Sequence, residues 1–211
     1  MRRVGESIMI SYVISIFVVI VSGLVNGFPD RLFKDAQYPF KFYKRQEWGA
    51  EPSTDHTPLI TPVPYVVIHH TYIPGACNTT EQCKTSMRSM QRYHNSLEWG
   101  DIGYHFCVGG EGGVYEGRGW KTKGIHAGNA NGISVGICLI GDWRTDLPPA
   151  IQLEATAALI EAGVKKGYIS PDYKLVGHKQ IMNTECPGGA LFQHISTWDH
   201  FSPVFEQPNL H

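Results

Sequence analysis

A histidine and a cysteine lie eight residues apart in the stretch 175–189 (LVGHKQIMNTECPGG), and their chemistry suits metal binding. His178 follows a short apolar run typical of a strand, and Cys186 precedes Pro-Gly-Gly, which continues neither a helix nor a central strand. A neutral imidazole and a thiolate on a rigid turn are good ligands for zinc. Two ligands do not complete a site, so a third must come from elsewhere. Three protein ligands would leave the fourth zinc position open to water.

The third ligand is expected from His69 or His70, which end the β-branched run 65–70 (YVVIHH). Side chains alternate along a strand, so the two histidines point to opposite faces and only one can join His178 and Cys186. The pattern does not decide which of them does so. A strand end suits a ligand because the sheet fixes the backbone while the following loop leaves room. A structural or surface histidine is the competing interpretation at each position.

The five cysteines are an odd number, so at least one of them is not in an internal disulfide. Cys77 and Cys83 lie six residues apart in a polar loop that leads into a predicted helix, and we expect them to form a disulfide. Cys107 and Cys138 lie in apolar strand-like runs and are expected to be buried thiols. Cys186 remains, and binding to a metal would protect it from pairing.

The N-terminus has the order of a secretory signal peptide. Arg2 and Arg3 precede an apolar run, Ile8–Val25, and a small residue, Gly27, follows it. We therefore expect a signal peptide at residues 1–27 and a secreted, extracellular protein in an oxidising compartment. A retained membrane anchor is the alternative, because the run is near the lower length limit of a membrane span. The net charge of −1 gives no reason to expect binding to nucleic acid or, after cleavage, to a membrane.

Hydrophobic patterning predicts strands that alternate with helices. The predicted strands are 65–70, 103–108, 113–115, 134–140 and 174–177, and the predicted helices are about 79–95, 149–166 and 191–198. Residues 28–64 are expected to be an irregular lead-in. The alternation predicts an α/β fold in which one domain, residues 65–211, has a central mixed β-sheet flanked by helices.

Seven short motifs occur in one order: HHT at 69–71, WGDIGYHF at 99–106, EGRGW at 116–120, GIHA at 124–127, SVGI at 134–137, GDW at 141–143 and GH…CP within 177–187. In this order and spacing they resemble the peptidoglycan recognition proteins, whose domain is related to the type-2 amidases. The resemblance covers about residues 42–201. The stretch 141–149 (GDWRTDLPP) further resembles the insect amidase-active LB-type branch.

The resemblance implies a zinc (Zn2+) site formed by His69, His178 and Cys186, with water in the fourth position. It places Tyr104 beside that water and gives Thr184 the role of orienting the water or the oxyanion. The implied reaction is hydrolysis of the amide between N-acetylmuramic acid and L-alanine in bacterial peptidoglycan and its muropeptides.

Family members without activity typically lack the cysteine ligand, so Cys186 favours an enzyme. Such an enzyme would be a secreted monomer that degrades peptidoglycan and dampens innate immune signalling. A non-catalytic module that senses peptidoglycan is the alternative.

Substrate contacts are carried over from the family motifs, and they fall on His70, Thr71, His94, Tyr104, His126 and Asn131. Gly119 and Trp120 match the pair found in family members that prefer diaminopimelate-type peptidoglycan, and Arg144 is a candidate partner for the extra carboxylate of that substrate. Each carry-over has a structural alternative. Gly119 could be a turn glycine, Trp120 could be a core residue, and His94 could pack against the core.

Overall fold

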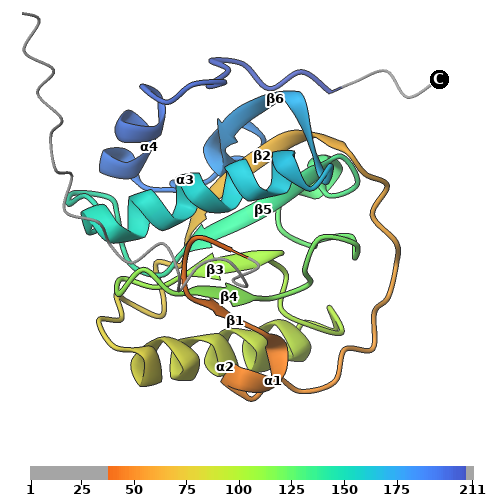
Figure 1. Cartoon of the computed structure of the whole chain (residues 1–211), viewed down its shortest axis with the longest axis vertical. Coiled ribbons are helices and arrows are strands. Elements are labelled where there is room, and N and C mark those ends of the chain that lie inside the picture. The colour runs from red at the N-terminus through yellow and green to blue at the C-terminus, as the bar shows by residue number, and fades with distance from the viewer. Residues whose placement is uncertain (1–37, 208–211) are drawn as a thin grey trace, which may run out of the picture. The chain divides into compact units, whose positions relative to one another are not determined.

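The computed structural model describes residues 38–207, which are organised around one six-stranded sheet (Figure 1). The strands lie in the order β1 (Phe42–Tyr43), β4 (Val114–Glu116), β3 (Phe106–Val108), β5 (Ser134–Leu139), β2 (Val63–His70) and β6 (Ile169–Gly177). Strands β3 and β4 are antiparallel, and every other neighbouring pair is parallel. The expected mixed α/β sheet is confirmed. The predicted signal peptide, residues 1–27, lies outside the described residues.

Alternating side chains give the sheet two apolar faces, each covered by helices (Figure 1). One face packs against α3 (Ala150–Lys165) and carries Val66, Ile68, Phe106, Val108, Val135, Ile137 and Leu139. The opposite face carries Cys107, Tyr115 and Cys138 and packs against α1 (Arg45–Trp48) and α2 (Thr80–Ser96). The core therefore occupies both sides of the sheet, as parallel strands require.

Helix α2 follows the sequence prediction closely. The hydroxyl of Thr79 caps its N-terminus by accepting a hydrogen bond from the backbone N–H of Gln82 at 3.3 Å. Its buried residues include Met87, Met90, Gln91 and His94, which lie on one face of the helix at helical spacing. The end of this stripe brings His94 to the candidate site.

Helix α3 begins directly after Pro149, and its buried face matches the apolar periodicity only in part, because it also includes polar residues. Ile151 is 53% exposed, whereas the neighbouring Gln152 is fully buried. The Gln152 amide donates hydrogen bonds to the backbone carbonyls of Val108, at 2.8 Å, and Ile140, at 3.3 Å. A buried amide that joins the helix to two strand ends is polar in sequence and therefore absent from a hydrophobic pattern.

Several boundaries differ from the expected ones. The lead-in is not wholly irregular, because it contributes β1 at the sheet edge and the short helix α1. Strand β6 begins at Ile169 rather than at 174, and the last helix, α4, spans Gly189–Ile195 rather than 191–198. Two 3₁₀ turns complete the fold, at Gly128–Ala130 and His178–Gln180. Within residues 38–207, every helix is too short or too polar to span a membrane.

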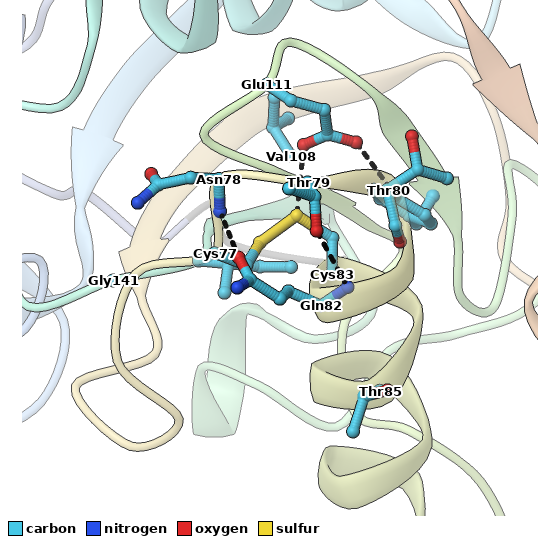
Figure 2. The surroundings of a disulfide bond; sticks show 12 residues. Cys77, Asn78, Thr79, Thr80, Gln82, Cys83, Thr85, Val108, Glu111 and Gly141 are labelled. Atoms are coloured by element: carbon cyan, nitrogen blue, oxygen red, sulfur yellow. Dashed lines mark hydrogen bonds between the residues drawn. A yellow bond between two sulfur atoms is a disulfide. The ribbon is translucent and has the colours of Figure 1, made fainter.

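A disulfide joins Cys77 to Cys83 at the start of α2, as the sequence predicts (Figure 2). The bridge closes the loop that contains the capping residue Thr79. Cys107 and Cys138 are buried free thiols, as expected. The loop between β2 and α2 is therefore fixed at the end that lies next to the helix.

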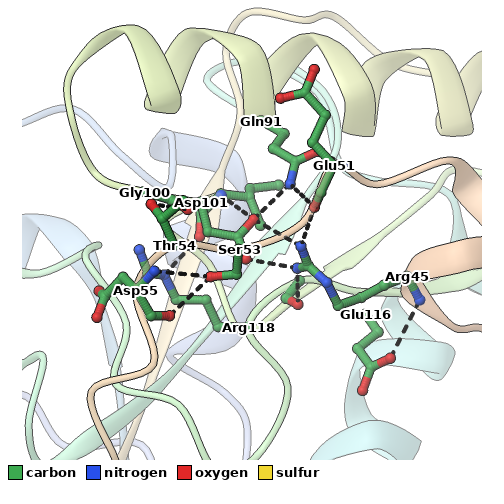
Figure 3. A network of polar contacts seen from close by, with 12 residues as sticks. Arg45, Glu51, Ser53, Thr54, Asp55, Gln91, Gly100, Asp101, Glu116 and Arg118 are labelled. Atoms are coloured by element: carbon green, nitrogen blue, oxygen red, sulfur yellow. Dashed lines mark hydrogen bonds and ion pairs between the residues drawn. The ribbon is translucent and has the colours of Figure 1, made fainter.

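A buried arginine ties the lead-in to the loops that follow α2 (Figure 3). The Arg118 guanidinium donates to the carbonyls of Trp99, Ile102 and Lys123 and to the carboxylate of Asp55, the last at 2.6 Å. Its side chain has no exposed surface, so the charge depends on these partners. The Thr57 N–H, followed by the Arg118 guanidinium, lowers the pKa of Asp55 to about 2.

We predict that Asp55→Asn destabilises the protein at neutral pH by about 1–2 kcal/mol, because it removes the anion that faces a buried guanidinium. Asp55 has a lowered pKa in the folded state, so its contribution is present above pH 4 and is lost as the pH falls towards 2. Urea unfolding of both proteins between pH 2 and 7 measures the difference. Asp172→Asn, at an exposed carboxylate, is the control. A difference that stays constant across this pH range would contradict the prediction.

Candidate metal centre

Two parallel strands bring the candidate ligands together at one edge of the sheet. Ile68 on β2 is paired with Gly177 on β6, so the next residues, His69 and His178, lie side by side with ring centroids 4.5 Å apart. Cys186 lies between the 3₁₀ turn and α4, and its Sγ is 3.7 Å from Nδ1 of His69. One ligand atom from each of the three residues lies within 4.8 Å of the other two.

The cysteine is held by hydrogen bonds on either side of its thiol. Its N–H donates to the hydroxyl of Thr184 at 3.2 Å, and its carbonyl accepts from the N–H of Lys179 at 2.7 Å. The backbone N–H of His70 lies 3.4 Å from Sγ and donates to it. This last contact shows why the histidines have separate roles: the His69 side chain approaches the thiol, whereas His70 offers its backbone.

Burial keeps all three groups in their uncharged forms. It lowers the pKa of His69 well below its usual value and that of His178 to about 4. Burial also raises the pKa of Cys186 to about 12, and the hydrogen bond from His70 N–H partly opposes this. Two neutral imidazoles therefore face a thiol that a bound cation would deprotonate.

The residues fit a zinc ion. Zinc binds imidazole nitrogen at about 2.0–2.1 Å and thiolate sulfur at about 2.3 Å, so tetrahedral donors lie roughly 3.5 Å apart. The Nδ1–Sγ distance of 3.7 Å is close to this value. Two nitrogens and one sulfur are also a donor set of the borderline-soft kind that zinc prefers.

A groove runs over this centre. The part next to His178 and Cys186 is a pocket of about 430 Å³, and it continues into a hollow of about 570 Å³ that reaches α2. Thr71, Tyr72 and Tyr104 line both parts. The first part is also lined by His70, Arg144, His178, Thr184, Glu185 and Cys186, and the second by Ile73, Pro74, Ser89, Met90, Tyr93 and His94.

Tyr104 lines both parts of the groove, and its hydroxyl can act as a hydrogen-bond donor or as an acid. Its ring lies 5.2 Å from that of His69 and 5.7 Å from that of His94, between centroids. Burial raises its pKa well above the usual value, so the hydroxyl stays protonated. A protonated phenol can donate to an oxygen on which negative charge develops.

Other groove residues predicted from the sequence use one atom to hold the backbone. Nδ1 of His70 accepts from the N–H of Trp143 at 3.2 Å, and Nδ1 of His94 accepts from the N–H of Gly103 at 3.0 Å. Burial lowers the pKa of both histidines, to about 4 for His94. Each neutral ring therefore carries its proton on Nε2, which is available to a ligand.

Thr71 differs from these histidines, because its hydroxyl is fully occupied by the backbone. The hydroxyl donates to the Pro74 carbonyl at 2.6 Å and accepts from the N–H of Gly141 at 2.7 Å. Its position in both parts of the groove is as predicted, but its polar group shapes the groove wall.

Two of the predicted substrate contacts lie behind the centre instead. His126 is buried, and its Nδ1 lies 3.0 Å from Nε2 of His69. Asn131 uses its side-chain oxygen to accept the backbone N–H groups of His126 and Ala127, at 2.9 and 2.7 Å. Neither side chain lines the groove. Both side chains therefore lie behind the centre rather than in the groove, because the loop after 124 turns its polar groups inward.

The Gly119–Trp120 pair also lies away from the groove. Trp120 is 8% exposed, stacks on Tyr168 and contacts Phe106 on the face covered by α3, and its Nε1 donates to the Tyr38 hydroxyl. Gly119 has a positive φ of 67°, which fits a turn. The structural alternatives hold for both, because the chain after β4 turns its indole into the core.

In the pocket next to the donors, the sequence reasoning missed Tyr72 and Glu185 and left Arg144 as a candidate. Tyr72 and Glu185 line the pocket, and Arg144 lies over the Tyr72 ring, with its guanidinium carbon 4.6 Å from the centroid. Arg144 also pairs with Asp142 at 2.8 Å. The spacing of Asp142 and Arg144, two residues apart, was the available signal, but the contact with Tyr72 joins segments far apart in sequence.

Comparison with known proteins agrees with this geometry. The N-acetylmuramoyl-L-alanine amidase family matches residues 60–189. Peptidoglycan-recognition protein LB of Drosophila melanogaster is 51% identical over 166 residues, which are 78% of this chain and 71% of that protein. The N-acetylmuramoyl-L-alanine amidase of Mus musculus is 42% identical over 166 residues, 77% of this chain but only 31% of the mouse protein.

Solved structures give the same result. Wild-type Drosophila PGRP-LB superposes with a TM-score of 0.77 at 49% identity, covering 79% of this chain and 99% of that one. A variant of PGRP-LB in complex with tracheal cytotoxin superposes with a TM-score of 0.76 at 51% identity, covering 76% and 96%. The chain therefore belongs to the type-2 N-acetylmuramoyl-L-alanine amidase family and, within it, to the peptidoglycan recognition proteins that resemble LB.

Proposed function

We propose that this protein is a secreted, zinc-dependent N-acetylmuramoyl-L-alanine amidase that cleaves the amide between N-acetylmuramic acid and L-alanine. The observation that carries the proposal is the convergence of His69, His178 and Cys186 beneath a groove that Tyr104 also lines. Family membership and the named activity of the mouse relative support the reaction. The disulfide between Cys77 and Cys83 fits a secreted protein.

The chemistry divides between the metal and the side chains around it. Bound zinc supplies Lewis acidity, which lowers the pKa of a bound water and polarises a carbonyl oxygen. Tyr104 keeps its proton at neutral pH and donates a hydrogen bond to the oxygen that gains charge. Thr184 accepts the N–H of Cys186, so its own hydroxyl hydrogen is free to orient the attacking water or the oxyanion.

The rest of the groove binds the substrate. His70 and His94 offer Nε2–H donors to hydroxyl, carbonyl and carboxylate oxygens of the glycan and stem peptide. The exposed rings of Tyr72 and Tyr93 provide apolar surface beside them. Destruction of an immune elicitor by this reaction would dampen innate immune signalling.

We predict that the wild-type protein releases the stem peptide from a muropeptide and that Cys186→Ala lowers the rate at least about 100-fold, because it removes a ligand whose metal contributes several kcal/mol to the reaction. Mass spectrometry of the products and zinc analysis of the protein measure the two effects. Cys107→Ala, which removes a buried thiol outside the centre, is the matched control.

Intact amide linkages after incubation with zinc-loaded wild-type protein would refute the enzyme and favour a module that only binds peptidoglycan. Full activity in Cys186→Ala, or in protein stripped by a chelator, would refute the role of the metal.

We further propose a preference for diaminopimelate-type peptidoglycan, based on Arg144 rather than on Gly119 and Trp120. Arg144 brings a permanent positive charge to the pocket, where its guanidinium stacks on Tyr72. The extra carboxylate of diaminopimelate is the feature such a group would recognise. Solved structures of PGRP-LB and PGRP-LE with tracheal cytotoxin support this substrate class.

For this preference we predict faster cleavage of diaminopimelate-type than of lysine-type fragments, and a loss of about tenfold in that ratio in Arg144→Gln, because a charge-assisted hydrogen bond disappears. Steady-state kinetics on the two fragments give the ratio. Arg92→Gln on the exposed side of α2 is the control. Equal rates on both fragments in the wild type would exclude the preference.

A further inference from the structure

His126 is buried directly behind the candidate centre, on the side away from the groove. Its Nδ1 lies 3.0 Å from Nε2 of His69, and the two rings are almost perpendicular, with an interplanar angle of 89°. In this arrangement a nitrogen on the edge of each imidazole ring faces a nitrogen on the other at hydrogen-bond distance. The two nitrogens can share only one proton in a hydrogen bond, so the identity of the donor matters.

The position of the proton in the hydrogen bond between His69 and His126 follows from the contact that Nδ1 of His69 makes. Nδ1 of His69 faces Sγ of Cys186 and belongs to the metal-binding cluster. A metal ligand must present an unprotonated nitrogen, so a neutral His69 carries its proton on Nε2. That N–H needs an acceptor, because His69 is only 1% exposed. Nδ1 of His126 is the acceptor within reach.

We propose that His126 is a positioning residue, which accepts the hydrogen bond from Nε2–H of His69 and thereby fixes the tautomer and ring orientation that present Nδ1 to the metal. The inference rests on the proposed zinc site and adds to it a partner outside the groove. Metal-binding histidines commonly depend on such a partner at their second nitrogen, and its removal typically costs 10–100-fold in metal affinity.

The backbone around His126 is shaped to hold its ring in place. A Cβ at Gly136 would lie 2.6 Å from Cγ and Nδ1 of His126, and one at Gly124 would lie 2.4 Å from Cδ2. Glycine at both positions therefore lets the ring lie against β5 and against its own loop. Asn131 fixes that loop by accepting the N–H groups of His126 and Ala127.

A further histidine supports the same strand without touching His69. His105 is fully buried, and its Nδ1 accepts the N–H of Gly136 at 2.9 Å. Its ring centroid lies 5.3 Å from that of His126. His105 thus offers a matched comparison: a buried histidine in the same neighbourhood that makes no direct hydrogen bond to a proposed ligand.

The experiment compares His126→Leu, which removes the acceptor, with His126→Asn, whose side-chain oxygen can replace Nδ1. Zinc affinity is measured by competition with a chromophoric chelator, and the stability of the metal-free proteins is measured by urea unfolding. We expect His126→Leu to lose 10–100-fold in zinc affinity, His126→Asn to stay within about threefold of the wild type, and His105→Leu to bind zinc normally even where it is less stable.

Nitrogen-15 NMR of wild-type protein, with and without zinc, gives an independent measurement of the His69 tautomer. The expected result is a proton on Nε2 that is coupled to His126 and protected from exchange. A His69 proton on Nδ1, or a folded His126→Leu variant with wild-type zinc affinity, would overturn the proposal. The tautomer measured in metal-free wild-type protein decides the question even where the variants do not fold.

These readouts separate the inference from the proposed function. A protein that binds zinc and shows the Nε2 tautomer but leaves muropeptides intact would refute the amidase and keep the positioning role. An active zinc enzyme whose His126→Leu variant binds zinc normally would keep the amidase and refute the positioning role of His126.

Discussion

The parallel pairing of β2 with β6 is the constraint on which the candidate centre depends. Because both strands run in the same direction, their carboxyl ends meet at one edge, and the pairing of Ile68 with Gly177 makes His69 and His178 neighbours. A slip of one residue would turn His69 to the opposite face. The register is fixed because both faces of β2 are buried, with Ile68 in the cluster under α3 and Val67 in a cluster on the other side. Apolar packing along the strand thus sets the geometry of polar groups at its end.

Burial against the face of the sheet that carries Cys107 and Cys138 explains why the donors are neutral. His69 is paired with Cys138 on β5, which is paired with Cys107 on β3, so the row beside the centre consists of buried cysteines. Burial penalises charge on imidazole and on thiol alike. A metal needs unprotonated nitrogens, and burial supplies them. Burial also keeps the Cys186 thiol protonated in the absence of a cation, so the ionisation of Cys186 is coupled to metal binding.

Much of this could be predicted from sequence, and the exceptions share a cause. Strand ends, helical stripes and an odd cysteine are local signals, so β2, α2, His178 and Cys186 lie where the patterns indicate, whereas the choice of His69 over His70 came from the family motif alone. Whether a side chain lies behind a site or in front of it depends on how the chain folds and is not given by a local sequence signal. His126 and Asn131 are polar residues in a loop, and nothing in their neighbours shows that the loop folds inward. Trp120 was equally ambiguous, because an indole suits both a groove and a core.

The groove contains donors that are oriented before any ligand binds. His70 and His94 each accept a backbone N–H at Nδ1 and keep a proton on Nε2, and the Thr184 hydroxyl accepts the N–H of Cys186 while its own proton remains free to donate. Groups fixed in this way need little reorganisation when charge develops on a bound oxygen, which is the condition for strong electrostatic stabilisation. Thr71 shows the contrast, since both functions of its hydroxyl are used by the backbone. A surface with several neutral donors suits a ligand rich in carbonyl, hydroxyl and carboxylate oxygens, and a stem peptide joined to an amino sugar is such a ligand. The loops of the protein thus orient these donors by their own hydrogen bonds, whether or not a metal is bound.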